Sequence, residues 1–186
     1  NLKSNKQEIY EDLDMFMNKP EELASSLLEM GIKSMKIWPF DFAKGASEGL
    51  TISEDDLKKY ITPFKKIRKA HGDKMKIKAE LHGIWSLEAS KKICQALEEF
   101  EMDWIEDPIW MDKFHDIPKL AKYTKQPLAG GETLGGLSQI SQLIDTLDLV
   151  YPIIDVTWGG GITFAKKAAT LAESKGKSIA FHDCSG

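Results

Sequence analysis

Short apolar runs alternate with longer amphipathic segments along most of the chain. Brief apolar runs bounded by turn residues predict strands, and segments with apolar residues three or four positions apart predict helices. The predicted strands cover 34–38, 75–80, 104–106, 127–129, 149–154 and 178–181. The predicted helices cover 20–31, 86–100, 116–123, 137–145 and 162–175, and one more begins at residue 53.

Several of these helices carry terminal signals. Pro20 stands at the start of the first predicted helix, and Gly31 stands at its end. Ser53 and Asp56 have the spacing of a capping box, although Asp replaces the usual Glu or Gln. Gly176 follows the last predicted helix, where a glycine commonly ends a helix. These signals support helices between the predicted strands.

Strands separated by single helices indicate βα units in a parallel sheet. The units are about 25 residues long, close to one eighth of the ~250 residues of a (β/α)8 barrel. A doubly wound open sheet is the alternative, but it requires a glycine-rich phosphate loop after an early strand. Glycines 159–161 follow a late strand and indicate a tight turn instead. We therefore expect an α/β, TIM-type (β/α) barrel over residues 20–186.

This barrel is expected to be incomplete, because only six strands are recognised, equivalent to strands two to seven of eight. Residues 1–19 show no clear pattern and are predicted to form an irregular lead-in segment. Six of eight strands would leave two exposed parallel edges, which is not expected of a stable barrel. We therefore expect either that the intact protein is longer or that disordered parts of it are left out of this sequence.

Composition excludes several classes of protein. Among 186 residues, 42% are hydrophobic and 29% are charged, which fits a globular chain with a core rather than a disordered one. The net charge of −4 gives no reason to expect a nucleic-acid partner. No apolar run reaches the roughly 18 residues of a membrane helix. Two cysteines, Cys94 and Cys184, without a signal peptide predict free thiols and a cytoplasmic location.

Ionisable residues recur where the predicted strands end. Glu80, Glu106, Glu132, Asp155 and His182 follow one another at intervals of 23 to 27 residues, one in each βα unit. A single acidic residue after a strand is usually a helix cap. Five in the same phase indicate a shared site, since functional groups of barrels occupy the carboxyl ends of the strands. A ring of carboxylates would repel itself unless a cation lay among them.

Two kinds of chemistry fit this ring. Oxygen ligands from Glu80, Glu106 and Glu132 suit a hard divalent ion, with Mg²⁺ favoured. Asp155 and His182 lie on neighbouring predicted strands, where a carboxylate could fix the imidazole tautomer and leave the other nitrogen basic.

Two more polar residues lie near the same edge. His82 stands two residues beyond Glu80, which places both side chains on one face if the segment is extended. Lys36 stands near the end of the first predicted strand. Trp38, Trp85, Trp110 and Trp158 also lie just past strands, and the sequence leaves open whether they pack the barrel rim or line a pocket.

The sequence resembles the barrel domain of the enolase superfamily, in its mandelate racemase/muconate lactonizing branch. The resemblance is carried by Met-Lys-Ile-Trp-Pro-Phe-Asp at 35–41, Glu-Leu-His at 80–82, Trp-Ile-Glu-Asp-Pro at 104–108, Gly-Glu-Thr at 131–133, Asp155 ahead of Trp-Gly-Gly-Gly at 158–161, and Phe-His-Asp-Cys at 181–184. It implies Mg²⁺ bound by Glu80, Glu106 and Glu132, and a base dyad of Asp155 and His182. It also implies a capping domain, to which nothing in this sequence corresponds, and we expect a homo-oligomer when the protein is full length.

Two departures from the family pattern bear on the reaction. The first metal ligand is Glu80, where the family usually has Asp. Lys36 is followed by Ile37 and Trp38, so the second lysine of the racemase Lys-x-Lys motif is absent. Racemisation needs a base on each side of the carbon, and the missing lysine weakens that interpretation. Glu80-x-His82 is similar to the Asp-x-His arrangement of galactonate dehydratase-like members, in which the His is the acid.

The resemblance therefore implies a Mg²⁺-dependent acid-sugar dehydratase. His182 would abstract the proton α to the substrate carboxylate, His82 would protonate the departing 3-hydroxyl, and Lys36 would offset negative charge near the carboxylate. The product would be a 2-keto-3-deoxy acid. A racemase or epimerase and a cycloisomerase are the alternatives within the superfamily. The alternative from another class is a non-catalytic barrel fragment that acts as a structural or interaction module.

Overall fold

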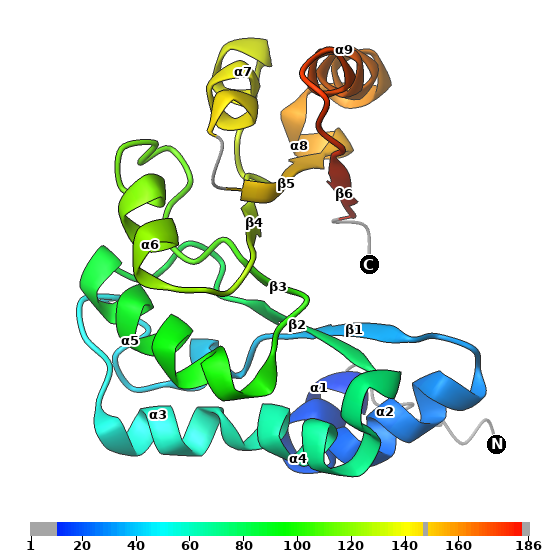
Figure 1. Ribbon diagram of the computed structural model, residues 1–186, viewed down its shortest axis with the longest axis vertical. Coiled ribbons are helices and arrows are strands. Elements are labelled where there is room, and N and C mark those ends of the chain that lie inside the picture. The colour runs from blue at the N-terminus through cyan, green and yellow to red at the C-terminus, as the bar shows by residue number, and fades with distance from the viewer. Residues whose placement is uncertain (1–10, 147–148, 184–186) are drawn as a thin grey trace, which may run out of the picture.

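The computed structural model describes residues 11–146 and 149–183. Six parallel strands pair in the order of the sequence and form one open, curved sheet with helices on its outer side (Figure 1). This is an open part of a barrel wall, in agreement with the predicted incomplete TIM-type fold. The strands are β1 (Ser34–Ile37), β2 (Lys76–Glu80), β3 (Trp104–Glu106), β4 (Leu128–Gly130), β5 (Leu149–Asp155) and β6 (Ala180–His182).

Each connection between neighbouring strands contains at least one helix. The α-helices are α1 (Glu11–Asn18), α2 (Pro20–Glu29), α3 (Glu54–Tyr60), α4 (Thr62–His71), α5 (Leu87–Leu97), α6 (Ile117–Tyr123), α7 (Leu137–Asp145), α8 (Val156–Gly159) and α9 (Gly161–Ser174). Short 3-10 helices are η1 (Pro39–Phe42), η2 (Gly72–Lys74) and η3 (Glu98–Phe100). The predicted strands and helices are all present, with boundaries shifted by a few residues.

The expectation of an irregular segment over residues 1–19 is wrong for α1, while residues 1–10 lie outside the described part of the chain. Leu13, Phe16 and Met17 have helical spacing and face the core, where Phe16 is buried. The Phe16 ring lies 5.2 Å from that of Trp38, centroid to centroid. Burial of this apolar face stabilises a helix that is only two turns long, which local propensity alone would not.

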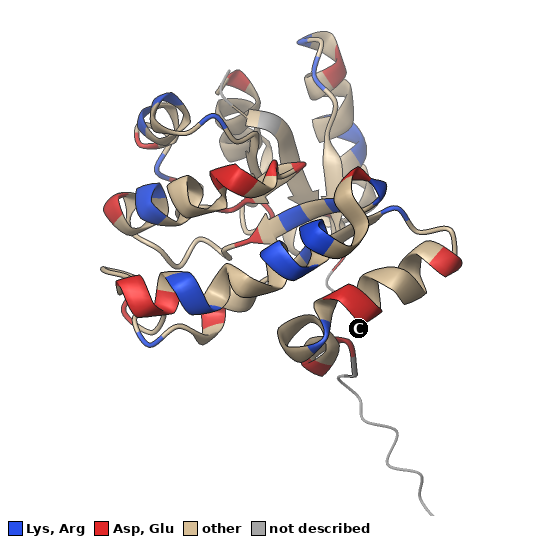
Figure 2. Cartoon of the chain, turned by 60° about the horizontal axis from the view of Figure 1, so that its bottom comes forward, with Lys and Arg blue, Asp and Glu red and all other residues tan. Residues whose placement is uncertain are grey.

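The surface helices follow the predicted capping chemistry. Ser53 Oγ accepts a hydrogen bond from the backbone N–H of Asp56 at the start of α3. The first turn of α3 is acidic and its last turn is basic, and the basic residues continue along α4 (Figure 2). This order complements the helix dipole. In the described part of the chain, every helix is too short or too polar to cross a membrane.

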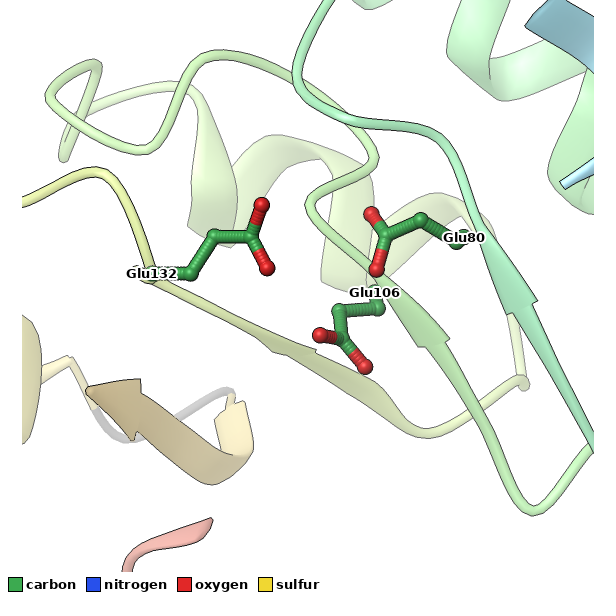
Figure 3. A group of neighbouring side chains, drawn as sticks. All are labelled: Glu80, Glu106 and Glu132. Atoms are coloured by element: carbon green, nitrogen blue, oxygen red, sulfur yellow. The ribbon is translucent and has the colours of Figure 1, made fainter. Parts of the chain in front are cut away.

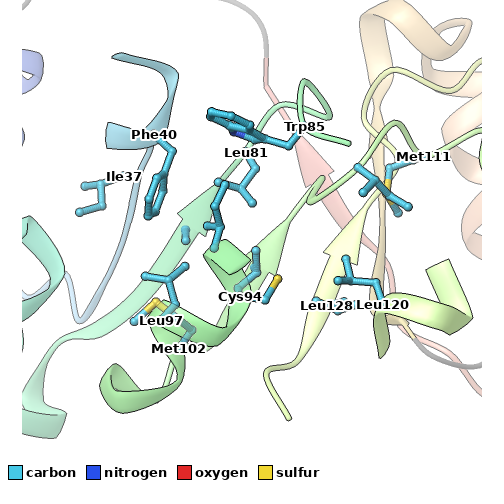
Figure 4. Packing of buried hydrophobic residues seen from close by; sticks show 14 of the residues in the cluster. Ile37, Phe40, Leu81, Trp85, Cys94, Leu97, Met102, Met111, Leu120 and Leu128 are labelled. Atoms are coloured by element: carbon cyan, nitrogen blue, oxygen red, sulfur yellow. The ribbon is translucent and has the colours of Figure 1, made fainter. Parts of the chain in front are cut away.

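The core lies between the outer face of the sheet and the helices. In β2, Ile77 and Ala79 are fully buried toward the helices, whereas Lys78 and Glu80 point to the other face, inside the curve. Cys94 of α5 packs in this core near Leu97 and Met102 (Figure 4). The alternation leaves the concave face of the sheet for polar side chains.

Cys94 provides a test of this packing. Burial, with a smaller effect from Glu98, raises the pKa of its thiol to about 12. The reactive thiolate is therefore scarce at mildly alkaline pH, and the thiol is out of reach. We expect Cys94 to resist alkylation by iodoacetamide in the folded protein and to react in urea, as measured by mass spectrometry of the peptide that contains it. Equal labelling rates in both conditions would contradict the packing of α5.

Candidate functional site

Three glutamates meet at the carboxyl ends of β2, β3 and β4 (Figure 3). Glu80 and Glu106 are the last residues of their strands and are directly paired in the register, and Glu132 follows β4 by two residues. One oxygen from each of the three lies within 4.8 Å of those of the others. All three side chains are buried. The register of parallel strands thus brings together residues that the sequence spaces 26 apart.

Glu80 and Glu106 are held by hydrogen bonds from residues close to them in the sequence. Glu80 Oε1 accepts from the backbone N–H groups of Leu81 (3.0 Å) and His82 (2.8 Å). Glu106 Oε2 accepts from the indole Nε1 of Trp104 at 2.8 Å. Each carboxylate therefore has one oxygen fixed by these bonds, and its other oxygen accepts a hydrogen bond from Lys36.

Glu132 is positioned by the turn before it. Gly131 has a φ of +120°, and a Cβ there would lie 2.3 Å from Leu143 Cδ2 and 2.9 Å from the carbonyl oxygen of Ile153. Only glycine fits so close an approach at this backbone angle. The N–H of Gly131 donates to Oδ1 of the buried Asp107 at 2.7 Å. Burial and then Glu80 raise the pKa of Asp107 well above its ordinary value.

Lys36 bridges two of the three glutamates. Its Nζ lies 2.7 Å from Glu80 Oε2 and 2.5 Å from Glu106 Oε1. Burial alone lowers the pKa of Lys36, but the two carboxylates outweigh burial and raise it. Burial and Glu80 raise the pKa of Glu106, against the opposing effect of Lys36. The ammonium group therefore offsets only part of the repulsion within the cluster.

The cluster suits a divalent cation. Glu132 Oε2 is buried and accepts no hydrogen bond from the residues that the structure describes. His182 Nε2 lies 3.2 Å from this oxygen, but not in hydrogen-bonding geometry. The ligands of Mg²⁺ are oxygens about 2.0–2.1 Å from the ion, so the carboxylates would need to move toward the ion to bind it. An all-oxygen donor set with an unsatisfied buried atom fits Mg²⁺.

Asp155 and His182 form the predicted pair. They end the neighbouring strands β5 and β6 and are paired in the register. His182 Nδ1 donates to Asp155 Oδ2 at 2.7 Å, and Asp155 Oδ1 accepts from the N–H of Trp158 at 2.6 Å as the cap of α8. The Asp155 carboxylate is thereby fixed, and it directs the Nε2 atom of His182 toward Glu132.

His82 lies beside the cluster, but not in the way the sequence predicted. β2 ends at Glu80, and the φ of His82 is +48°, so the two residues are not in one extended segment. Its ring lies against Trp38 at 5.8 Å between centroids and donates from Nδ1 to Asp41 Oδ2 at 2.7 Å. Burial lowers the pKa of His82, but the bond to Asp41 and the nearby glutamates raise it overall.

The four tryptophans that lie just past the strands divide between the core and the surface. Trp85 is buried in the core, which excludes a role as a pocket wall. Trp38 is half-buried against His82, while Trp110 and Trp158 are exposed. The Trp158 ring lies 5.1 Å from that of His182. The side chains of Trp38 and Trp158 therefore lie against the two imidazoles.

The concave face of the sheet has a hollow of about 450 Å³ beside Glu106. It is lined by residues that include Lys36, Glu106 and His182. The hollow thus shares Glu106 with the carboxylate cluster, and it also contacts Lys36 and His182.

Comparison with known proteins identifies the family of this chain. Residues 19–186 match the family described as Enolase C-terminal domain-like. The chain belongs to this family and lies in the mandelate racemase/muconate lactonizing branch of the enolase superfamily, with galactonate dehydratases among its relatives.

Two curated relatives illustrate the range of activities. A D-gluconate/D-galactonate dehydratase of Picrophilus torridus is 29% identical over 170 residues, which are 90% of this chain and 42% of that protein. A 3,6-anhydro-alpha-L-galactonate cycloisomerase of Streptomyces coelicolor is 25% identical over 157 residues, which are 83% of this chain and 44% of that protein. The chain thus spans less than half of the length of these relatives.

Solved structures agree in fold. An enolase of the mandelate racemase subgroup from Agrobacterium tumefaciens is 42% identical, with a TM-score of 0.85 over 90% of this chain and 46% of that one. L-Talarate dehydratase from Polaromonas sp. JS666, in complex with Mg and L-glucarate, is 26% identical, with a TM-score of 0.74 over 95% of this chain and 44% of that one.

The metal assignment can be tested at Glu106. In the protein that contains this chain, Glu106→Gln removes one negative charge and one ligand oxygen. We expect Mg²⁺ binding measured by calorimetry to weaken by at least about 10–100-fold, the loss that outer partners of a metal site already cause. Glu173→Gln, on the exposed surface of α9, is the matched control and should bind Mg²⁺ normally. If neither variant nor parent binds the ion specifically, the chain is a non-catalytic barrel fragment.

Proposed function

We propose that the protein containing this chain is a Mg²⁺-dependent dehydratase of acid sugars. The observation that carries the proposal is the pair of imidazoles that flank the carboxylate cluster in strand order. His82 follows β2 and His182 ends β6, and each donates from Nδ1 to an aspartate at 2.7 Å. Dehydration needs one base and one acid, and two separately held imidazoles can supply them.

The base assigned to the reaction is His182. With Nδ1 bonded to Asp155, the Nε2 atom can accept the proton α to the substrate carboxylate. Asp155 stabilises the imidazolium that results, since its carboxylate accepts a hydrogen bond from the Nδ1–H group. A proton on such a carbon is weakly acidic, so the negative charge that develops on the substrate carboxylate must be offset.

Glu80, Glu106 and Glu132 would hold Mg²⁺ where this charge develops. When bound, the ion would supply positive charge to the substrate carboxylate. Lys36, already between Glu80 and Glu106, would add a further positive charge close by.

The acid assigned to the reaction is His82. The bond from C3 to the hydroxyl breaks while Nε2 of His82 gives its proton, and the hydroxyl leaves as water. The electrons of the C2–H bond form the new C2–C3 double bond. The resulting enol tautomerises to a 2-keto-3-deoxy acid, so that the net change is loss of one water. Relatives that are named D-galactonate and D-gluconate/D-galactonate dehydratases support this reaction and an aldonic-type substrate.

A cycloisomerase is the second candidate, because the Streptomyces coelicolor relative carries that name. It would share the abstraction of the α-proton but release no water. A panel of aldonic, aldaric and 3,6-anhydro-aldonic acids separates the two reactions. A dehydratase converts an open-chain acid into a product that is one water lighter, whereas a cycloisomerase converts the anhydro acid into a product of unchanged mass, as measured by mass spectrometry.

The test of the base is His182→Asn. Removing a general base costs about 10²–10⁴-fold in rate, and we expect a loss of that size in dehydration and in exchange of the α-proton with D₂O. His115→Asn makes the same change at an exposed histidine and should leave both rates unchanged. Dehydration at the parent rate by His182→Asn would contradict the proposal.

A further inference from the structure

Asp41 makes a contact that the proposed reaction does not yet explain. It lies in η1, the turn after β1, and its Oδ2 accepts a hydrogen bond of 2.7 Å from Nδ1 of His82. Its other oxygen, Oδ1, is buried and accepts no hydrogen bond from the described residues. A buried carboxylate oxygen without a partner is destabilising. Such an unsatisfied group calls for an explanation other than local stability.

The His82 ring is held from three directions. The backbone N–H of His82 donates to Glu80, and its Nδ1 donates to Asp41. The ring also packs edge-on against the ring of Trp38. Trp38 is itself stacked on Phe42, at 5.6 Å between centroids. Because the φ of His82 is +48°, the strand does not set the direction of the side chain, and these contacts must do so.

Only the bond to Asp41 distinguishes the two ring nitrogens. An ionised carboxylate accepts hydrogen bonds and cannot donate one, so Nδ1 must carry the hydrogen of this bond. Nε2 is then the atom left for a substrate, and no described residue is hydrogen-bonded to it. The Trp38 contact and the backbone bond would permit a flipped ring, whereas the carboxylate does not.

The same arrangement occurs on the other side of the carboxylate cluster. Asp155 ends β5 and binds His182 at the end of β6, while Asp41 follows β1 and binds His82 after β2. In both pairs the aspartate comes from the preceding βα unit and uses Oδ2 on Nδ1 over 2.7 Å.

We infer that Asp41 is the positioning residue of His82: it fixes the ring so that Nε2 faces the substrate and delivers the proton to the leaving hydroxyl. The inference rests on the proposed function for the role of His82 as the acid. Asp41 itself touches no reacting atom. The paired arrangement gives one oriented imidazole for the base and one for the acid.

The first measurement needs neither metal nor substrate. In protein labelled with ¹⁵N-histidine, the Nδ1 proton of His82 should give a downfield resonance that exchanges slowly with solvent. It is assigned by its loss in His82→Asn. Asp41→Ala, which removes the acceptor, should abolish this resonance, and Asp112→Ala, the same change at an exposed aspartate, should retain it. A resonance that persists unchanged in Asp41→Ala overturns the inference, whatever reaction the protein catalyses.

The second measurement separates the acid from the base. In the intact, Mg²⁺-loaded protein we expect Asp41→Asn to lower kcat for dehydration by about 10–100-fold, typical of losing the outer partner of a functional histidine. KM should stay near the parent value, and exchange of the α-proton in D₂O should continue, because His182 is intact. With a substrate analogue that carries fluorine at C3, the kcat of Asp41→Asn should fall much less, since fluoride leaves without full protonation. Asp41→Glu, which keeps the carboxylate, should recover part of the rate.

The outcomes distinguish the inference from the function on which it rests. If Asp41→Asn lowers the rates of elimination and of α-proton exchange equally, with hydroxide and with fluoride as the leaving group, Asp41 only supports the loop. That result would overturn the inference. Full dehydration by His82→Asn, with His182→Asn inactive, would overturn the acid assignment and the inference with it. If the parent protein acts on no acid sugar, the proposed function fails. The NMR measurement then decides alone whether Asp41 fixes the ring.

Discussion

The repulsion among three buried carboxylates is the constraint on which this site depends. Two unit charges 4 Å apart interact by about 4 kcal/mol at the effective dielectric of a protein surface, and by more in a drier site. Glu80, Glu106 and Glu132 are buried, and one oxygen of each lies within 4.8 Å of the others. Lys36 provides one positive charge against three negative ones. A divalent cation would supply the two that are missing, while Lys36 remained nearby.

The parallel sheet is what imposes this crowding. Direct pairing of Glu80 with Glu106 places two carboxylates side by side at adjacent strand ends, and the tight turn at Gly131 brings in the third. The same register pairs Asp155 with His182. Outward-facing residues of β1, β2 and β3, such as Ile37, Ile77 and Ile105, are buried under the helices, so the concave face is free to carry charge. Fold stability and site chemistry are thus assigned to opposite faces of one sheet.

The strands and the site glutamates could be predicted because both follow a period. Alternation within strands marks the buried face, and the βα repeat sets the phase of the residues at the strand ends. The helix α1 was missed, since it is short and depends on the tertiary contact between Phe16 and Trp38. The direction of His82 was also missed, because a residue at positive φ breaks the two-residue alternation.

Asp41 and Asp107 carried no predicted role for a related reason. They lie in turns, and no repeat along the chain indicates which distant atom a turn residue will meet. Asp41 reaches His82 across 41 positions, and Asp107 reaches Gly131 across 24. Both stand in the motifs at 35–41 and 104–108 that carry the family resemblance. The motif therefore pointed to these residues, but only the geometry indicates what they contact.

The most direct test of the central claim is a crystal structure of the protein with Mn²⁺ in place of Mg²⁺, with anomalous data collected at the manganese absorption edge. We predict one anomalous peak bound by oxygens of Glu80, Glu106 and Glu132, with the Lys36 ammonium no longer bridging Glu80 and Glu106. An absence of any peak at saturating Mn²⁺, with Lys36 still between the two glutamates, would contradict the account.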